Sequence, residues 1–216
     1  IALGVVIGFP LLTAFALQYV TSAHSIVFVG LLPLCTAVFA STRGAERPKP
    51  FFWLFSILGA ASVVGYALKS YGYFSLKGDL LMLAAIIVCG LAYSEGGRLS
   101  RKIGGWQVIC WSLILSLPVM LPMALITLPE SFEHVTTRAV ISLGYVSLCS
   151  MLLGFVFWYR GLAQGGVAAV GQIQLLQPFI GLGLAALLLN ETINWSMLIV
   201  TLIAAICVAA AKKYAN

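Results

Sequence analysis

Long apolar runs alternate with short polar breaks along the whole chain. Each run holds about 20 residues, which is the length of a helix that crosses the hydrocarbon core of a bilayer. The breaks between the runs are too short to form a soluble domain of their own. The pattern predicts eight membrane-spanning helices, over residues 1–19, 24–42, 51–68, 79–98, 106–127, 138–159, 167–189 and 195–211.

Composition argues against a soluble fold and favours helices over strands. Hydrophobic residues make up 62% of the 216 residues and charged residues only 8%, whereas a soluble domain carries about 25% charged residues. A membrane-spanning barrel would alternate polar and apolar residues over about ten positions, but the apolar runs here are continuous. The sequence therefore predicts an all-α membrane protein.

The basic residues indicate which way the helices point. Successive breaks lie on alternate sides of the bilayer, with nine basic residues on one side and three on the other. The first set is Arg43, Arg47, Lys49, Arg98, Arg101, Lys102, Arg160, Lys212 and Lys213, and the second is Lys69, Lys77 and Arg138. Because loops rich in basic residues stay in the cytoplasm, we expect both chain ends there, in the cell inner membrane. The net charge of +6 comes from basic residues in the breaks, where they set the orientation of the helices. It therefore does not call for a nucleic-acid partner.

Two parts of the chain match at one fixed offset, which indicates an internal repeat. Pro33 and Pro178 are 145 positions apart, and so are Glu46 and Glu191. The offset pairs each of the first three spans with a span five places later. Because five is odd, the two copies would cross the membrane in opposite directions, as in the inverted repeats of secondary transporters.

The repeat predicts how the chain is organised. We expect residues 1–68 to be the last three helices of a first repeat, 69–78 to be a linker, and 79–213 to be a second repeat of five helices. On this interpretation an intact protein has ten helices, two of them ahead of Ile1.

Three segments resemble one family in combination. They are "FALQYVTSAHSIVFVGLLPLCTAVFA" (15–40), "KGDLLMLAAIIVCGLAYSEGGRLSRKIGG" (77–105) and "WYRGLAQGGVAAVGQIQLLQPFIGLGLAALLLNETI" (158–193). Together they resemble the drug/metabolite transporter superfamily, in its ten-helix EamA branch. The resemblance implies a secondary active carrier that exports a small metabolite or amino acid by alternating access, often against protons. The alternative is a lipid-handling or assembly membrane protein that uses the same fold.

Glu95 is the first candidate for chemistry. It lies within "YSEGGR" (93–98), where the family usually has a basic pair, and a few ångströms inside the predicted membrane boundary. An ionisable side chain in a span often binds protons or a cationic substrate, so we expect Glu95 to be a proton-coupling residue. The alternative is a simple ion pair with Arg98, three residues further along the helix.

Two amides and two tyrosines are candidates for binding the solute. Gln174 and Gln177 share one face of their predicted helix, and Gln172 points largely away from it. The resemblance favours a solute cavity at this face, although such amides can also simply join two helices. Tyr93 and Tyr145 are candidates for the wall of a pocket for an aromatic or cationic ligand.

Pro33 and Pro178 lie near the middles of their spans. Each proline removes a backbone hydrogen bond, so we expect them to be hinges; the alternative is a static kink.

The sequence gives no support to an enzyme, a cofactor or a metal. It contains no nucleophile elbow, no H-E-x-x-H and no phosphate-binding G-x-x-x-x-G-K-[ST]. The five cysteines show no C-x-x-C spacing. The partners that we expect are the lipid bilayer, a small-molecule substrate and protons.

Overall fold

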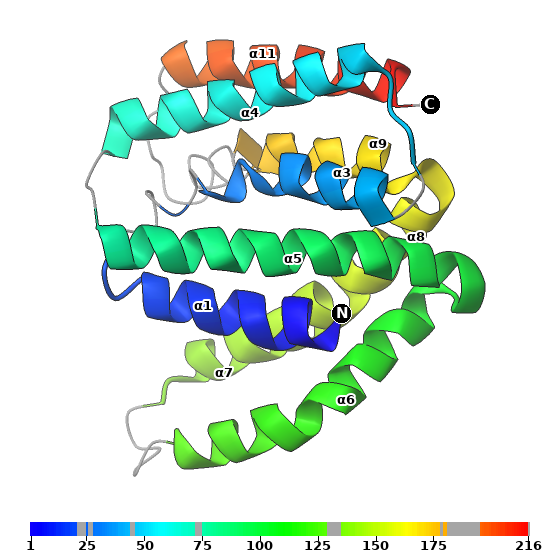
Figure 1. Cartoon of the computed structure of the whole chain (residues 1–216). Helices are drawn as coiled ribbons and strands as arrows, with labels where there is room; N and C mark the ends of the chain where they lie inside the picture. The colour runs from blue at the N-terminus through cyan, green and yellow to red at the C-terminus, as the bar shows by residue number, and fades with distance from the viewer. Residues whose placement is uncertain are drawn as a thin grey trace.

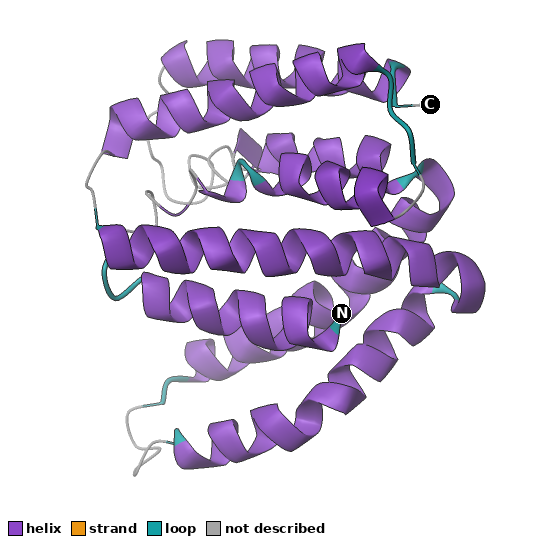
Figure 2. Ribbon diagram, viewed as in Figure 1, coloured by secondary structure: helices purple, strands orange, loops and turns teal. Residues whose placement is uncertain are grey.

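The computed structural model describes residues 1–20, 25, 28–43, 46–71, 75–128, 135–177, 179–180 and 195–215, with the backbone alone at 66–71, 196–198 and 201. Helices dominate these residues (Figures 1 and 2). The label α marks α-helices; η marks the π-helices η1 and η2 and the 3-10 helix η3. The first half holds η1 (Ala2–Gly8), α1 (Phe9–Ala16), α3 (Leu32–Arg43), α4 (Pro50–Tyr71) and α5 (Leu76–Ile103). The second half holds α6 (Gly105–Ile126), α7 (Thr137–Tyr145), η2 (Val146–Gly154), α8 (Phe155–Gly165), α9 (Val167–Gly171), η3 (Gln172–Leu176) and α11 (Trp195–Lys213).

The lengths of these helices fit membrane crossing. In the described part of the chain three helical stretches are long and apolar enough to span a bilayer, namely Leu76–Ile103, Gly105–Ile126 and Thr137–Gly165. Shorter apolar helices cover Ala2–Ala16, Pro50–Gly65 and Val167–Leu176. The predicted all-α membrane fold is therefore confirmed.

Two of the three pairs of spans that the repeat matches lie side by side and run in opposite directions. In Figure 1, α4 and α11 form the uppermost pair, and α3 lies beside α9 in the next layer. α3 runs towards the edge that carries the C-terminus, whereas α9 and η3 run away from it. Opposite directions are compatible with an inverted repeat, and both the repeat and the division into two domains stay predictions.

One end of the bundle collects the positive charge. α3 ends at Arg43, α5 ends just after Arg101 and Lys102, and α11 ends at Lys213. All three of these helix ends lie at the same edge in Figure 1. We call this edge the basic end; it is the edge at which the sequence predicts the cytoplasm.

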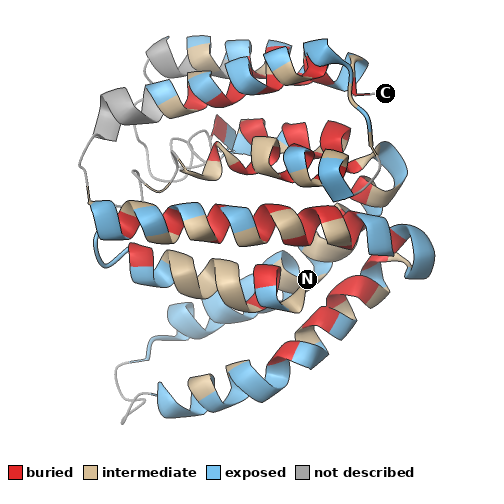
Figure 3. Cartoon of the chain, viewed as in Figure 1, coloured by how far each residue is buried: buried red, intermediate tan, exposed pale blue. Residues whose placement is uncertain are grey.

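α5 is the central helix of the bundle, and Figure 3 shows buried residues repeating along its length. Glycines let its neighbours approach closely. A Cβ on Gly96 would overlap the Tyr159 ring of α8, and one on Gly90 would lie 2.9 Å from the Cys35 sulfur of α3. By contrast, α7 and η2 have no buried residues, and their apolar side chains are suited to contact with lipid.

Pro33 begins a helix rather than bending one. A turn at residues 30–31 interrupts the second span, and α3 starts directly after it at Leu32. A proline in the first helical turn removes an N–H that would have no intrahelical partner. The interruption is thus a feature of this span, whereas Pro178 lies outside the described residues.

Candidate functional site

A cluster of buried and half-buried aromatic and amide side chains joins α5, α8 and η3. The ring of Tyr93 on α5 lies 5.5 Å from Trp158 and 6.1 Å from Phe155, both on α8. Tyr159 packs against Phe155 at 5.7 Å and is fully buried. The Tyr93 hydroxyl lies beside the side chain of Gln174. We call these five residues, Tyr93, Phe155, Trp158, Tyr159 and Gln174, the central cluster.

The central cluster contains polar atoms that lack partners. Trp158 Nε1, Tyr159 Oη and Gln174 Oε1 are buried and make no hydrogen bond to any described residue. A buried polar group without a partner destabilises a protein by about 1–3 kcal/mol. The cluster therefore combines unpartnered donors and acceptors with aromatic rings.

Gln172 is a buried residue that the sequence argument missed. It is 0% exposed, and its Nε2 donates to the carbonyl oxygen of Pro33 over 3.4 Å. Gln172 lies on the same helix face as the buried residues Ala169 and Leu175, three positions before and after it. This face is opposite the one that carries Gln174, so the buried side of the helix is the side that the sequence argument set aside. Its Oε1 is also unpartnered in the described part of the chain.

The predicted site residues do not all come together. Tyr93 and Gln174 lie in the central cluster, whereas Gln177 is exposed three residues further on. Tyr145 ends α7 with 66% of its surface exposed, apart from the cluster. Their roles in binding stay predictions.

Glu95 takes part in a small ion-pair network at the basic end. Its carboxylate lies 2.8 Å from Arg98 on the same helix and 3.5 Å from Arg43 at the end of α3. Arg98 also donates to the carbonyl oxygen of Arg43 over 3.4 Å. The geometry shows the ion pair that the sequence left as the alternative role, and the coupling role stays a prediction.

Glu46 is a second residue that the sequence argument did not place in a site. Its two carboxylate oxygens accept the backbone N–H groups of Val167 and Ala168, each over 2.9 Å. Arg101 Nη2 lies 2.6 Å from the same carboxylate. Glu46 therefore caps the N-terminus of α9, where the helix dipole favours negative charge. Only its match to Glu191 in the repeat hinted at a special position.

No metal centre is assembled by the residues that the structure describes. No three His, Cys, Asp or Glu side chains among them lie close enough to hold an ion. The carboxylates of Glu46 and Glu95 at the basic end form ion pairs with arginines, and the central cluster holds uncharged polar side chains.

Comparison with known proteins identifies the family. The model of the EamA-like transporter family matches residues 76–211. The chain is 60% identical over 216 residues to the "Uncharacterized transporter YdeK" of Bacillus subtilis (strain 168), covering all of this chain and 75% of that protein. It is 27% identical over 150 residues to the "Probable amino-acid metabolite efflux pump" of Salmonella typhimurium (strain LT2), covering 64% of this chain and 49% of that one.

A solved crystal structure shares the fold. It superimposes with a TM-score of 0.83 and 16% identity, over 97% of this chain and 75% of the other. Together with the apolar helices, these matches confirm the drug/metabolite transporter resemblance seen in the sequence. The chain belongs to the EamA-like transporter family, and it is a multi-pass membrane transporter of small molecules.

Proposed function

We propose that this protein exports a small metabolite or amino acid across the cell inner membrane, with the basic end and the C-terminus in the cytoplasm. Transport proceeds by alternating access, with no covalent change to the solute. Rocking between the two repeats uses the interruption at Pro33 and its repeat partner Pro178 as hinges. The printed name of the Salmonella relative supports this class of solute.

One observation carries the proposal: buried polar atoms without partners, on two different helices, surround the same aromatic surface. Tyr159 Oη and Trp158 Nε1 are donors, and Gln174 Oε1 is an acceptor. A solute with an amide, hydroxyl or amino-acid backbone supplies the missing partners and lies against the ring of Tyr93. We propose that Gln177 and Tyr145 contact the solute in other conformations of the cycle.

Replacing Gln174 by leucine is expected to lower export about tenfold at low solute concentration. Loss of one hydrogen bond to a bound solute changes binding by about 1.4 kcal/mol, which is a factor of ten. The measurement is the metabolite content of the medium, by mass spectrometry, from cells that overproduce the protein.

Gln18→Leu is the matched control, because Gln18 is an exposed amide outside the central cluster. Equal export by the Gln174→Leu variant and this control, at equal protein in the membrane, would remove Gln174 from the solute site.

We further propose that Glu95 couples transport to protons. It lies on α5, two residues beyond Tyr93 of the central cluster, and 24% of its side chain is exposed. A proton that entered there would release Arg43 and Arg98 from the carboxylate, which loosens the contact between α3 and α5.

Glu95→Gln is expected to leave a carrier whose transport no longer depends on external pH, because glutamine cannot titrate. The measurement is initial export rate between pH 6 and pH 8 in proteoliposomes, beside wild type and Arg138→Gln. A pH profile identical to wild type would exclude Glu95 from coupling.

One feature favours the second candidate function, lipid handling. An apolar groove of about 560 Å³ lies between η1 and α6, with Leu3 and Ile7 on one wall and Trp111, Leu115 and Val119 on the other. A lipid handler would move a fluorescent phospholipid between leaflets of protein-containing vesicles. The export proposal expects no movement above that of protein-free vesicles.

A further inference from the structure

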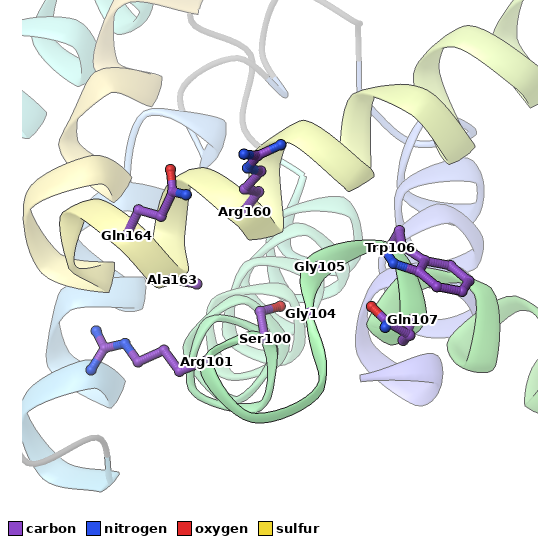
Figure 4. A pocket seen from close by; sticks show the side chains of 9 residues that line it. All are labelled: Ser100, Arg101, Gly104, Gly105, Trp106, Gln107, Arg160, Ala163 and Gln164. Atoms are coloured by element: carbon purple, nitrogen blue, oxygen red, sulfur yellow. The ribbon is translucent and has the colours of Figure 1, made fainter.

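A pocket with polar and charged side chains in its wall lies at the basic end, where α5 turns into α6. Its volume is about 550 Å³. α5, the turn, α6 and α8 each contribute to its wall (Figure 4). The lining residues are Ser100, Arg101, Gly104, Gly105, Trp106, Gln107, Arg160, Ala163 and Gln164. We call it the turn pocket. It is separate from the central cluster, with which it shares no residue.

Backbone donors of α6 open into the turn pocket. α6 begins at Gly105, and no side chain caps its first N–H groups. Gly104 turns the chain with a φ of +92°, a conformation that favours glycine. The N–H groups of Gly105, Trp106 and Gln107 therefore have no hydrogen-bond acceptor within the described chain. Free N–H groups and the positive end of the helix dipole together attract an anion.

A buried hydroxyl provides independent evidence for a ligand. Ser100 is 6% exposed, and its side chain lines the pocket (Figure 4). Its Oγ makes no hydrogen bond to any described residue. Such a hydroxyl is unfavourable unless something in the pocket accepts its proton.

Two guanidinium groups add positive charge. Arg160 reaches the turn pocket from α8 and forms no ion pair with the acidic residues that the structure describes. Arg101 enters from α5 and is already paired with Glu46. Arg160 is therefore the charged group that remains available to a ligand, and its planar fork suits two oxygens of one phosphate.

We propose that the turn pocket binds a phosphate group carrying negative charge. Arg160, the Ser100 hydroxyl and the first N–H groups of α6 hold its oxygens. Trp106, which is 59% exposed beside the pocket, has the position of a residue at the level of lipid headgroups. The phosphate comes either from an anionic phospholipid or from a soluble phosphate ester. The proposal is independent of which solute the protein exports.

The test measures binding by the purified full chain in detergent, using native mass spectrometry and thermal unfolding. The lipid probes are phosphatidylglycerol, which carries a net negative charge, and phosphatidylcholine, whose choline cation neutralises its phosphate. The soluble probes are glycerol 3-phosphate and glycerol. Arg160→Gln is compared with Arg138→Gln, an exposed arginine of α7 that is not in the pocket. Ser100→Ala is a second pocket variant.

We expect phosphatidylglycerol to bind at least several-fold more tightly than phosphatidylcholine. Arg160→Gln should weaken this binding about tenfold, the effect of losing one charge-assisted hydrogen bond, and Arg138→Gln should not. If glycerol 3-phosphate stabilises wild type and glycerol does not, the same site takes a soluble ester; if only the lipid binds, the source is the membrane.

Two results would overturn the proposal. One is equal binding by wild type of the probes with and without a net negative charge. The other is a preference for phosphate that survives in both Arg160→Gln and Ser100→Ala. Should Arg160→Gln fail to fold, Ser100→Ala alone decides between the outcomes, because it removes only an unpartnered hydroxyl.

Discussion

Replacing Gly96 by leucine is expected to prevent this protein from folding. A Cβ at position 96 would overlap the Tyr159 ring and lie 2.7 Å from its Cζ. Tyr159 is 0% exposed and packs against Phe155 at 5.7 Å, so the ring has no space into which it can move. One added methyl group in such a contact destabilises a protein by about 1–3 kcal/mol, and leucine adds three further carbons. The measurement is yield of monodisperse protein after detergent extraction.

Gly144→Leu is the matched control for this substitution. A Cβ at Gly144, near the end of the exposed helix α7 where the chain continues into η2, would meet no atom within 4 Å. Leucine there should leave folding intact and even favour the helix by about 1 kcal/mol. A further check is Gly96→Ala with Tyr159→Leu, which should recover part of the stability that Gly96→Ala loses. Equal yields of the two leucine variants would contradict the close packing of α5 on α8.

The sequence predicts the spans well because helix length and apolar content are set locally. Each described helix overlaps a predicted span, although α8 continues to Gly165, six residues beyond the predicted end of its span. α5 likewise continues to Ile103, five residues beyond its predicted end. Those extra residues carry Arg101 and Lys102. The predicted span ended where charged residues begin, because they leave the hydrocarbon core. The helix itself continues past the core as long as its backbone hydrogen bonds continue.

The site is harder to predict because its geometry depends on partners far apart in sequence. Glu46 caps a helix that starts 121 positions later, and a single sequence does not reveal which helix that is. Gln172 is buried because its face of the helix packs inward together with Ala169 and Leu175, and a single sequence does not reveal which of two apolar-flanked faces packs inward. Tyr93 and Gln174 stand out separately as candidates in the sequence, since polar groups in apolar spans are rare. That their side chains lie beside each other is visible only in the structure, and their role in binding stays a prediction.

At the basic end, two carboxylates each join helices that are far apart in the sequence. Glu46 ties the loop after α3 to α9 and, through Arg101, to α5. Glu95 and Arg43 join α3 to α5 beside it. Both carboxylates thus hold together three helices that meet at the basic end of the bundle. If the protein works by the alternating access that we propose, these contacts must loosen whenever the basic end opens.

Glu46→Gln is expected to lower the stability of the protein by about 3 kcal/mol, the range for breaking a mostly buried, charge-assisted network. Only 17% of the Glu46 side chain is exposed. Glutamine keeps the size and one acceptor oxygen, but it loses the charge, so one N–H at the start of α9 is left without its partner. At about 2–4 °C per kcal/mol, the unfolding midpoint in detergent should fall by about 6–12 °C.

Arg101→Gln removes the ion pair with Glu46 but keeps the hydrogen bonds from the backbone of α9 to Glu46, so it separates the two contributions. Arg101 is 42% exposed, so its loss should lower the midpoint by far less, because the two backbone N–H groups remain capped by Glu46. Hydrogen exchange gives a local readout: the amides of Val167 and Ala168 should exchange faster in Glu46→Gln but not in Arg101→Gln. If the two variants destabilise equally and leave both amides protected, the carboxylate acts only as an ion-pair partner. Helix capping would then contribute nothing to the way α9 is held against α3.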